Sequence, residues 1–282
     1  MRVSIVVPSK GCFYLDYLMK TLRDQVVKPH EVILVLKGCS PKEIDKINEH
    51  SKLNLVIVEQ KKGYFTHALN LGKKVASGDI VIFTDDDAIA PKGWIKRYIK
   101  LHELYPKIAG ISSRDIYIDL DSLSIKPTPD DWAHIRTYRW IFRPLLDRPH
   151  PLLKDYRLGV YITKDFKIAH GPYIPYRSCY SLPFRGVNMS FKAEYIYDVW
   201  FPEHPALIRA PGNEQYFGLQ LILRGFSTIY IADNPILHIY RYNSLSRTNE
   251  RNIVKNLKKE ETIMNILIKN LLLKYDKTNK KI

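Results

Sequence analysis

The amino-terminal part of the chain alternates between two hydrophobic patterns, and this alternation constrains the fold more than any other feature. Short runs rich in β-branched residues predict strands in RVSIVVP, HEVILVLKG, LNLVIVEQ and DIVIFTDDD. Between them, helical spacing is found in LDYLMKTLRDQ, SPKEIDKINEHS and YFTHALNLGKKVAS. Ser40 is a suitable N-cap with Pro41 at the first helical position, and Gly78 is suited to end the third helix. We therefore expect an α/β fold with a mostly parallel sheet flanked by helices.

Three consecutive aspartates follow the last of these predicted strands. In such sheets, ligands bind beyond the carboxyl ends of the strands, where the loop PSKG and Asp85, Asp86 and Asp87 would meet. Carboxylates at Asp85 and Asp87 can reach one Mg²⁺ or Mn²⁺ ion, whose other ligands are commonly substrate phosphates. The alternative is a solvated turn or a helix N-cap ahead of Pro91. Adjacent like charges at the end of a buried strand favour a cation.

The overall charge favours an anionic partner. The 282 residues contain 44 Lys plus Arg against 29 Asp plus Glu, a formal net charge of +15. Nucleic acid, anionic lipid headgroups and a phosphorylated small molecule all fit this balance. The sequence shows no signature of a common nucleic-acid-binding module, and the aspartates would repel phosphate without a metal, so we do not expect a nucleic-acid partner.

Cysteine content and hydropathy bear on the cellular compartment. Cys12, Cys39 and Cys179 form no CxxC pair and no zinc-type cluster, so we expect neither a disulfide nor a structural zinc, and interpret the cysteines as small core residues. No run approaches the roughly 18 to 20 apolar residues of a spanning helix, and MRVSIVVPSK does not resemble a signal peptide. These features predict a cytoplasmic protein, with peripheral contact to the cytoplasmic face of a membrane as a further hypothesis.

Blocks in a fixed order resemble the family 2 glycosyltransferases with the GT-A fold. VSIVVPSKG is similar to the opening strand of that family, KKGYFTHALNLGKKVASGDIVIFTDDDAIAPKGW to its helix and DxD segment, and FRGVNMSFKAEYI to its acceptor-side motif. GNEQYFGLQLILRGF is similar to the helix that carries the catalytic base. The resemblance, from residue 2 to about residue 240, implies a Rossmann-like sheet. We divide the chain into a nucleotide-sugar half (1–113), an insertion or lid (114–185), an acceptor-side and catalytic-base half (186–245) and a C-terminal amphipathic helix with a basic tail (246–282).

The resemblance implies roles for the donor-side residues. Asp85 and Asp87 take the positions of the DxD pair, with Asp87 on the metal, Asp85 near the ribose or a metal-bound water, and Asp86 in the variable position. The first loop of the nucleotide pocket corresponds to Pro8, Ser9 and Lys10, and Asn70 and Gly72 match a further family segment.

Two departures from the family pattern leave the donor open. Leu69 stands where an arginine is usual, so Lys73, Lys10 or His67 would face the diphosphate. Lys37 and Gly38 stand where an aspartate commonly reads uracil, which leaves both a UDP-sugar and a GDP-sugar or another nucleotide as alternatives.

On the acceptor side, the resemblance implies that Glu214 is the catalytic base and that Asn188 lies near the acceptor. A helix-start glutamate stabilised by the dipole is the simpler interpretation of Glu214. His238 follows a predicted strand and corresponds to a histidine of the metal shell in relatives, although a structural role is equally compatible with its position. Trp132, Trp140, Tyr138 and Arg143 either contact a sugar or acceptor phosphate or form the core of a small insertion, and we expect core for most of them.

The implied function is an inverting, metal-dependent transfer of a sugar, such as a hexose, from a nucleotide donor to a hydroxyl of a glycan, lipid-linked or protein acceptor. One carboxylate takes the acceptor proton while the metal stabilises the departing diphosphate. A sugar-nucleotide nucleotidyltransferase shares the fold class but usually begins with a glycine-rich phosphate loop, which VVPSKGCF is not. A catalytically idle relative and a non-catalytic basic protein that binds nucleic acid are further alternatives.

The C-terminal segment reads as an amphipathic helix with two apolar stripes. One predicted stripe suits packing on the domain: Ile253, Leu257, Met264, Ile268, Leu271 and Tyr275. Ile263, Ile266 and Leu273 fall on the other side among lysines. That second stripe predicts contact with an anionic membrane or a homodimer.

Overall fold

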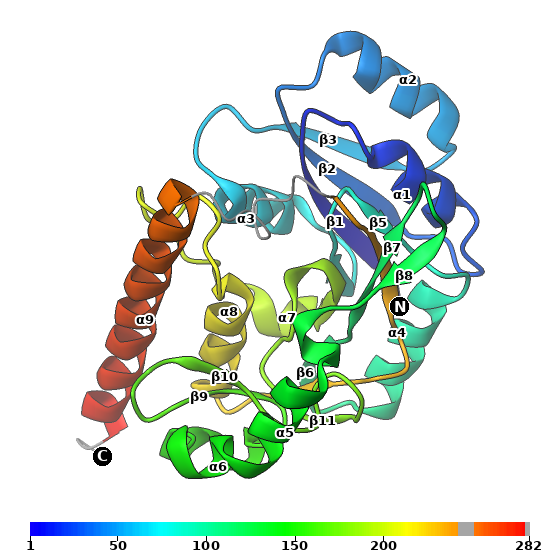
Figure 1. Cartoon of the computed structure of the whole chain (residues 1–282). Helices are drawn as coiled ribbons and strands as arrows, with labels where there is room; N and C mark the ends of the chain where they lie inside the picture. Colours follow the sequence, from blue (N-terminus) through cyan, green and yellow to red (C-terminus); the bar gives the residue numbers. More distant parts are fainter. Residues whose placement is uncertain (242–250, 280–282) are drawn as a thin grey trace.

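The computed structural model describes residues 1–241 and 251–279, and its central feature is a mixed eight-stranded sheet (Figure 1). The strand order is β11-β13-β6-β12-β4-β1-β2-β3. Its strands are β1 (Val3–Lys10), β2 (Glu31–Lys37), β3 (Leu55–Glu59), β4 (Ile80–Phe83), β6 (Ile108–Ser112), β11 (Cys179–Tyr180), β12 (Met189–Lys192) and β13 (Ser227–Tyr230). The four predicted strands are confirmed, and β1 pairs in parallel with β2 and β4 as expected. Strand β12 runs antiparallel between β4 and β6.

Alternate residues of the parallel strands enter two different cores. On one face, Ile5 and Val7 of β1 pack in the cluster that contains residues of α1 (Leu15–Arg23) and α4 (Trp94–Leu104). On the other, Val6 packs with residues of α3 (Phe65–Val75), α7 (Ala193–Ile196) and α8 (Asn213–Ile222). A strand that is buried on both faces explains why RVSIVVP is apolar at nearly every position.

Local capping signals were correctly interpreted at one helix and incorrectly at another. The side chain of Ser40 accepts from the backbone of Glu43 and the side chain of Glu43 accepts from the backbone of Ser40, so the predicted cap of α2 (Pro41–Ser51) is a full capping box. Gly78 lies beyond the end of α3, which is followed by extended Ala76. A Cβ at Gly78 would lie 2.7 Å from the backbone nitrogen of Ser4, so the glycine permits a close approach of two chain segments.

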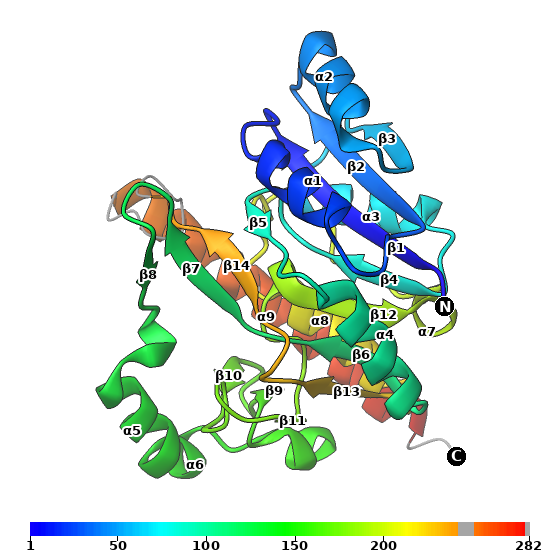
Figure 2. The same ribbon diagram turned by 90° about the vertical axis from the view of Figure 1, so that its right-hand side faces the viewer.

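A second, smaller sheet lies at the carboxyl edge of the parallel strands (Figure 2). Its order is β5-β14-β7-β8, built from β5 (Ala88–Ile89), β7 (Asp115–Asp119), β8 (Ser124–Lys126) and β14 (Ile236–Ile239). Strand β14 is parallel to β7 and antiparallel to β5, so distant parts of the sequence meet directly after the aspartates.

The segment 114–185 contributes to several parts of the molecule. It holds β7, β8 and β11, the helices α5 (Ala133–Ile141) and α6 (Arg143–Leu146), and the hairpin of β9 (Val160–Ile162) and β10 (Ile168–His170). It also holds short 3-10 helices at Pro129–Asp131 and Pro151–Tyr156, and a third, Gly186–Asn188, follows directly after it. The expectation that its aromatic residues form core is wrong for Trp132 and Trp140, which are 47% and 50% exposed. Tyr138 and Arg143 are half-buried.

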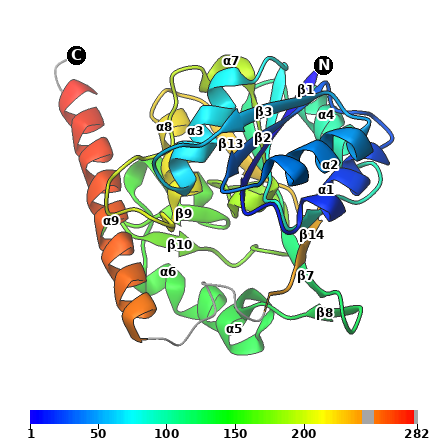
Figure 3. The same ribbon diagram turned by 90° about the horizontal axis from the view of Figure 1, so that it is seen from above.

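Helix α9 (Arg251–Asn279) packs beside α8 (Figures 1 and 3). Met264 and Ile268 of the predicted docking stripe are buried, its other members are half-buried, and Leu272 is a buried member that the helical wheel missed. Ile266 and Leu273 are exposed as predicted, whereas Ile263 packs against the core, so the second stripe is smaller than expected. The predicted start of this segment at residue 246 and the tail at 280–282 lie outside the described residues. Within residues 1–241 and 251–279, no helix combines the length and apolar character needed to cross a membrane.

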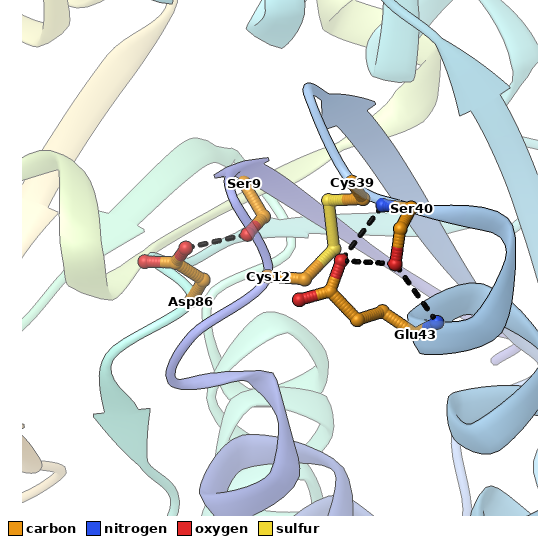
Figure 4. The surroundings of a disulfide bond; sticks show 6 residues. All are labelled: Ser9, Cys12, Cys39, Ser40, Glu43 and Asp86. Atoms are coloured by element: carbon orange, nitrogen blue, oxygen red, sulfur yellow. Dashed lines mark hydrogen bonds between the residues drawn. A yellow bond between two sulfur atoms is a disulfide. The ribbon is translucent and has the colours of Figure 1, made fainter.

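The expectation of three unpaired cysteines is wrong, because Cys12 and Cys39 form a disulfide (Figure 4). Lys10 of β1 pairs in register with Lys37 of β2, and each cysteine lies two residues beyond its paired lysine, which brings the Cα atoms to 5.7 Å. Disulfides are rare in cytosolic proteins. The absence of a disulfide can therefore no longer be used as an argument for the predicted cytoplasmic location. Cys179 is a free, half-buried thiol, and burial raises its pKa to about 12.

Reduction of the Cys12–Cys39 bond is expected to lower the free energy of unfolding by roughly 2 to 4 kcal/mol, because the bond closes a loop in the unfolded chain. Thermal unfolding with and without dithiothreitol measures the change. The double variant Cys12→Ser/Cys39→Ser is the control, since its transition should not respond to the reductant. A wild-type transition that is indifferent to reduction would contradict the disulfide.

Candidate active site

The aspartates lie where the first loop and the end of β4 meet, as predicted. Strand β4 ends at Phe83, and the next residue, Thr84, donates its backbone N–H to the carbonyl of Val6 in β1. Ser9 Oγ, at the end of β1, donates to Asp86 Oδ2 at 2.5 Å (Figure 4). Pro8 and Ser9 are buried in this edge, and Lys10 is exposed. The structure therefore brings the loop and the aspartates to one edge of the sheet.

The structure also brings Asp85, Asp87 and His238 together. His238 in β14 pairs with Ala88 in β5, which places its ring beside Asp87, and Nε2 lies 3.0 Å from Asp87 Oδ1. One candidate ligand atom from each of Asp85, Asp87 and His238 lies within 4.8 Å of the other two. Carboxylate oxygens with one imidazole nitrogen suit Mn²⁺, and the carboxylates suit Mg²⁺.

Asp115 orients the imidazole of His238 from behind. Nδ1 of His238 lies 3.0 Å from Asp115 Oδ2, and Asp115 is buried in the neighbouring strand β7. Burial acts to lower the pKa of His238, but hydrogen bonds to Asp115 and Asp87 and the charges of these carboxylates raise it well above its ordinary value, so without a metal both ring nitrogens donate. If a metal took the place of the proton on Nε2, Asp115 would still hold the proton on Nδ1. The ring of Tyr117 lies beside the imidazole, with the centroids 4.9 Å apart and the planes tilted by 30°. The sequence analysis missed Asp115, because only the pairing of β7 with β14 reveals it.

The charges of the cluster fit a divalent cation. Burial, together with the charge of Asp87, raises the pKa of Asp85 to about 7, and burial raises that of Asp86 to about 6. Burial also acts to raise the pKa of Asp87, but His238 and Arg241 hold it below its ordinary value. Both carboxylate oxygens of Asp87 are buried, and His238 Nε2 and Arg241 Nη2 lie against them. A divalent cation at these carboxylates would stabilise the ionised form of Asp85.

Arg241 is a site residue that the sequence analysis did not single out. One guanidinium nitrogen, Nη2, lies 2.6 Å from Asp87 Oδ2, and the group lies over the ring of Tyr14, 5.2 Å from its centroid. It follows His238 by three residues and lies two residues beyond the end of β14. In the sequence, Arg241 could have been recognised as a basic residue at the end of the apolar run PILHIY. The structure thus places a cationic side chain beside Asp87.

Glu214 lies in the first turn of α8 and is half-buried. Burial raises the pKa of its carboxyl group to about 7, and Arg185 acts in the opposite direction. Arg185 is in turn paired with Asp115 at 3.1 Å and with Asp130 at 2.6 Å. A series of charged groups therefore runs from Glu214 through Arg185 and Asp115 to His238. A carboxyl group with a pKa near neutrality can exchange a proton at physiological pH.

Asn188 does not have the predicted acceptor-side role, because its side chain is fully used within the protein. Its Oδ1 accepts from Trp94 Nε1 at 2.9 Å and from Tyr98 Oη at 2.7 Å. Its Nδ2 donates to the backbone carbonyls of Arg114 and Asn234, each at 2.9 Å. An amide has two donors and two acceptor positions, so no capacity is left for a substrate. Asn188 is instead a buried junction between α4 and the strands that carry the site.

Lys73 and Asn70 are also placed differently from the prediction. The Nζ of Lys73 donates to the carbonyls of Ile196 and Tyr197, at 2.9 and 3.0 Å. These residues follow the end of β12 that pairs with the start of β4, which is the edge opposite the aspartates. Asn70 Nδ2 donates to the carbonyl of Phe201 and to Glu203. Both side chains brace the segment after α7, so they do not line a diphosphate site.

His67 and Lys10, the two remaining candidates for the basic group that faces the diphosphate, differ in their surroundings. His67 Nδ1 lies 2.9 Å from Glu203 Oε2, so His67 contacts the same glutamate as Asn70. Lys10 pairs in register with Lys37, whose Nζ donates to the carbonyl of Gly63 at 2.8 Å. The two lysines therefore lie side by side at the ends of β1 and β2, where a nucleotide base or diphosphate could approach.

Comparison with known families identifies the chain. The family model described as glycosyl transferase family 2 matches residues 4–152, more than half of the sequence. The chain belongs to glycosyl transferase family 2. This family 2 chain gives no match in a search of curated proteins.

Solved structures of glycosyltransferases share the fold. The mannosyltransferase PcManGT from Pyrobaculum calidifontis, in complex with GDP-Man and Mn²⁺, has a TM-score of 0.57 and 18% identity, over 86% of this chain and 58% of that one. TarS 1-349 of S. aureus with UDP-GlcNAc has a TM-score of 0.59 and 14% identity, over 96% and 72%. GalNAc-T7 with UDP, GalNAc and Mn²⁺ has a TM-score of 0.63 and 13% identity, over 86% and 44%. This family 2 chain thus spans just over half of PcManGT and less than half of GalNAc-T7. These likenesses establish the fold, a mixed α/β sheet of the GT-A type.

Proposed function

We propose that this chain is a metal-dependent inverting glycosyltransferase that moves a hexose from a nucleoside-diphosphate donor to a hydroxyl acceptor. The observation that carries the proposal is the convergence of Asp85, Asp87 and His238 at the carboxyl edge of the sheet of a family 2 chain. Structural neighbours solved with a nucleotide sugar and with Mn²⁺ support this assignment.

In this proposal, Asp85, Asp87 and His238 hold Mg²⁺ or Mn²⁺, which would stabilise the negative charge of the departing diphosphate. Asp115 would hold the proton on Nδ1 of His238, so that Nε2 is the nitrogen that binds the metal. Arg241 lies beside the same carboxylate and would move from Asp87 to a phosphate oxygen when the donor binds, because a cation on Asp87 replaces its ion pair. Ser9 positions Asp86 at the rim of the nucleotide pocket.

Glu214 is the proposed general base. The acceptor oxygen forms a bond to the anomeric carbon from the face opposite the diphosphate, while the bond from that carbon to the diphosphate oxygen breaks with its electron pair. The acceptor proton passes to the Glu214 carboxylate. Arg185 stabilises the ionised carboxylate before the transfer, and burial favours the neutral acid after it.

The proposed donor is a nucleotide hexose. In this proposal, the residues near Lys37 at the edge of the sheet select the nucleotide base. The neighbours include a GDP-Man and a UDP-GlcNAc complex, so fold likeness does not distinguish the two bases. A lysine at position 37 donates hydrogen bonds and accepts none, which favours a base that presents carbonyl oxygens at this position. Both guanine and uracil carry such oxygens. The acceptor class that fits the proposal is any glycan, lipid-linked sugar or protein that offers a hydroxyl group.

The test of the proposed function is a calorimetric titration with UDP, GDP, CDP and TDP in Mn²⁺ and again with a chelator. We expect one nucleotide to bind most tightly, and only in the presence of the metal, because the aspartates repel a bare diphosphate. Equal affinity in both buffers would argue against the site.

The rate of transfer is expected to rise with pH through about 7. The pKa of Glu214 is raised to about 7 by burial, and only its ionised form accepts a proton, so the active fraction falls below that pH. The measurement is kcat against pH at saturating donor and metal. The residual kcat of Glu214→Gln should not show this rise with pH. If the rise persisted in the variant, it would come from the titration of another group.

Helix α9 is proposed to position the loop that leads into α8, the helix that carries Glu214. Glu260 is buried in α9, and its Oε2 accepts the backbone N–H groups of Arg209 and Ala210 at 2.9 and 2.8 Å. Ala210 and Gly212 have φ of +51° and +85°, so this stretch holds left-handed conformations directly before α8. Without the carboxylate, the half-buried N–H of Arg209 and the buried N–H of Ala210 would lose this acceptor.

Glu260→Ala is expected to lower kcat by roughly 10- to 100-fold while donor affinity stays unchanged, because misplaced catalytic groups lose rate. Glu260→Gln should restore most of the activity, since the amide oxygen still accepts hydrogen bonds. Glu261→Ala, at the exposed neighbouring position, is the matched control. A loss of donor affinity equal to the loss of rate would instead indicate general destabilisation.

A further inference from the structure

Helices α5 and α6 carry a surface that the proposed function does not use. Five large apolar side chains on it are 50 to 69% exposed: Trp140, Ile141, Phe142, Leu145 and Leu146. We call these five residues the apolar ridge. Single exposed apolar residues are common on protein surfaces, but a run of this kind marks an interaction site. The helices lie at the end of the molecule opposite α2 (Figures 1 and 2).

Helix α5 buries a charged residue and exposes apolar ones, which is the reverse of an ordinary surface helix. Its buried residue is Arg139, whose guanidinium pairs with Asp130 and donates to the carbonyl of Ile174 at 3.2 Å. In the next turns, Arg143 donates to the carbonyl of His170 at 3.0 Å and pairs with Asp147. Soluble proteins usually direct the apolar face of such a helix inward and its charges outward. Here, ionic contacts anchor the helix from within and leave the apolar ridge outward.

Basic residues outnumber acidic ones among the exposed charges of the segment that carries the ridge. Between residues 133 and 157 the exposed Arg and Lys side chains are Arg136, Arg148, Lys154 and Arg157, whereas the exposed carboxylate is Asp155. Apolar and aromatic side chains with flanking basic residues are the composition that binds an anionic lipid surface, because the apolar groups enter the interface while the cations meet the phosphates. Tryptophan is favoured at that depth.

We propose that the apolar ridge is a docking surface for an anionic lipid bilayer. A second copy of this chain fits the surface less well, since two molecules that each carry a charge of +15 repel one another. The lipid contact does not depend on the proposed activity. It replaces α9 as the predicted membrane contact, because only Ile266 and Leu273 of the α9 stripe are exposed.

Flotation of the full chain with vesicles tests the proposal. The vesicles contain equal parts of phosphatidylglycerol and phosphatidylcholine, and pure phosphatidylcholine vesicles serve for comparison. We expect binding to the anionic vesicles that weakens with salt, and at least about tenfold weaker binding by Trp140→Ser/Phe142→Ser/Leu145→Ser. Arg136→Gln/Arg148→Gln should also weaken it by roughly tenfold.

The matched control is Ile266→Ser/Leu273→Ser on α9, which should bind as the wild type does. Thermal unfolding of each variant establishes that it is folded, which is expected because the altered side chains are exposed. Absence of wild-type binding, loss of binding in the α9 control alone, or a wild-type dimer that dissociates in the ridge variant would each overturn the proposal. The last two results would assign contact to α9 and to a second copy, respectively.

Discussion

Glu214→Gln is expected to lower the rate of sugar transfer by roughly 10²- to 10⁴-fold while donor binding stays nearly unchanged, which is the usual contribution of a positioned general base. The amide has the shape of the carboxyl group but takes no proton from the acceptor. Folding should not suffer, because the substitution removes a carboxylate that burial destabilises. Single-turnover kinetics with saturating donor, beside a calorimetric donor titration, separates the two effects.

Glu194→Gln is the matched control for this substitution. Glu194 lies in the first turn of α7, the helix position that Glu214 has in α8, but it is exposed and distant from the cluster. The control should transfer sugar at the wild-type rate. Full activity of Glu214→Gln would remove the residue from the mechanism, and weaker donor binding in that variant would give it a donor-side role.

Asp87→Asn is expected to reduce transfer by about 10³-fold and to reduce nucleotide affinity in Mn²⁺ to the wild-type value in chelator. The physical reason is that the charge on Asp87 is central to the cluster, and metal stabilisation of a leaving group contributes several kcal/mol, at about 1.4 kcal/mol for each tenfold change in rate. Titration of Mn²⁺ followed by its electron paramagnetic resonance signal measures the loss of metal directly.

Asp165→Asn is the control for Asp87→Asn, because Asp165 is exposed and is not part of the cluster. It should keep both metal binding and activity. Unfolding curves in metal-free buffer should show that Asp87→Asn remains folded. Metal-dependent nucleotide binding of wild-type strength in Asp87→Asn would show that the ion lies elsewhere.

The sequence predicted those features that depend on local patterns. Strands buried on both faces appear as continuous apolar runs, and the capping box at Ser40 lies within one turn of a helix. The position of the aspartates followed from the rule that parallel strands present their carboxyl ends at one edge. His238 could be placed beside them only through its resemblance to relatives, because its pairing with Ala88 joins segments that are distant in sequence.

Contacts between distant segments account for the incorrect predictions. Cys12 and Cys39 are joined by the register of β1 and β2, which no spacing rule for cysteines records. Asn188 lies in a motif of the family, but its amide serves packing and not a ligand. Lys73 was a candidate because an arginine is absent at position 69, but its Nζ donates to the carbonyl of Ile196 at the opposite edge of the sheet.

The aromatic insertion shows a different limit of sequence patterns. A stretch rich in Trp, Phe and Leu ordinarily predicts core, and α5 would satisfy that prediction if Arg139 pointed to solvent. Asp130 and the carbonyl of Ile174 instead hold Arg139 inside, so the apolar residues face outward. The pairing partner of one arginine therefore determines which face of the helix is exposed.

The most direct test of the account is release of the nucleoside diphosphate from a panel that includes GDP-mannose and UDP-N-acetylglucosamine, measured with Mn²⁺, with chelator, and after Mn²⁺ is restored. The account predicts that at least one donor is cleaved in the presence of the metal, that chelation stops the release, and that restored Mn²⁺ recovers it. Release that continues undiminished in chelator, or no release from any donor of the panel, would contradict a metal-dependent glycosyltransferase.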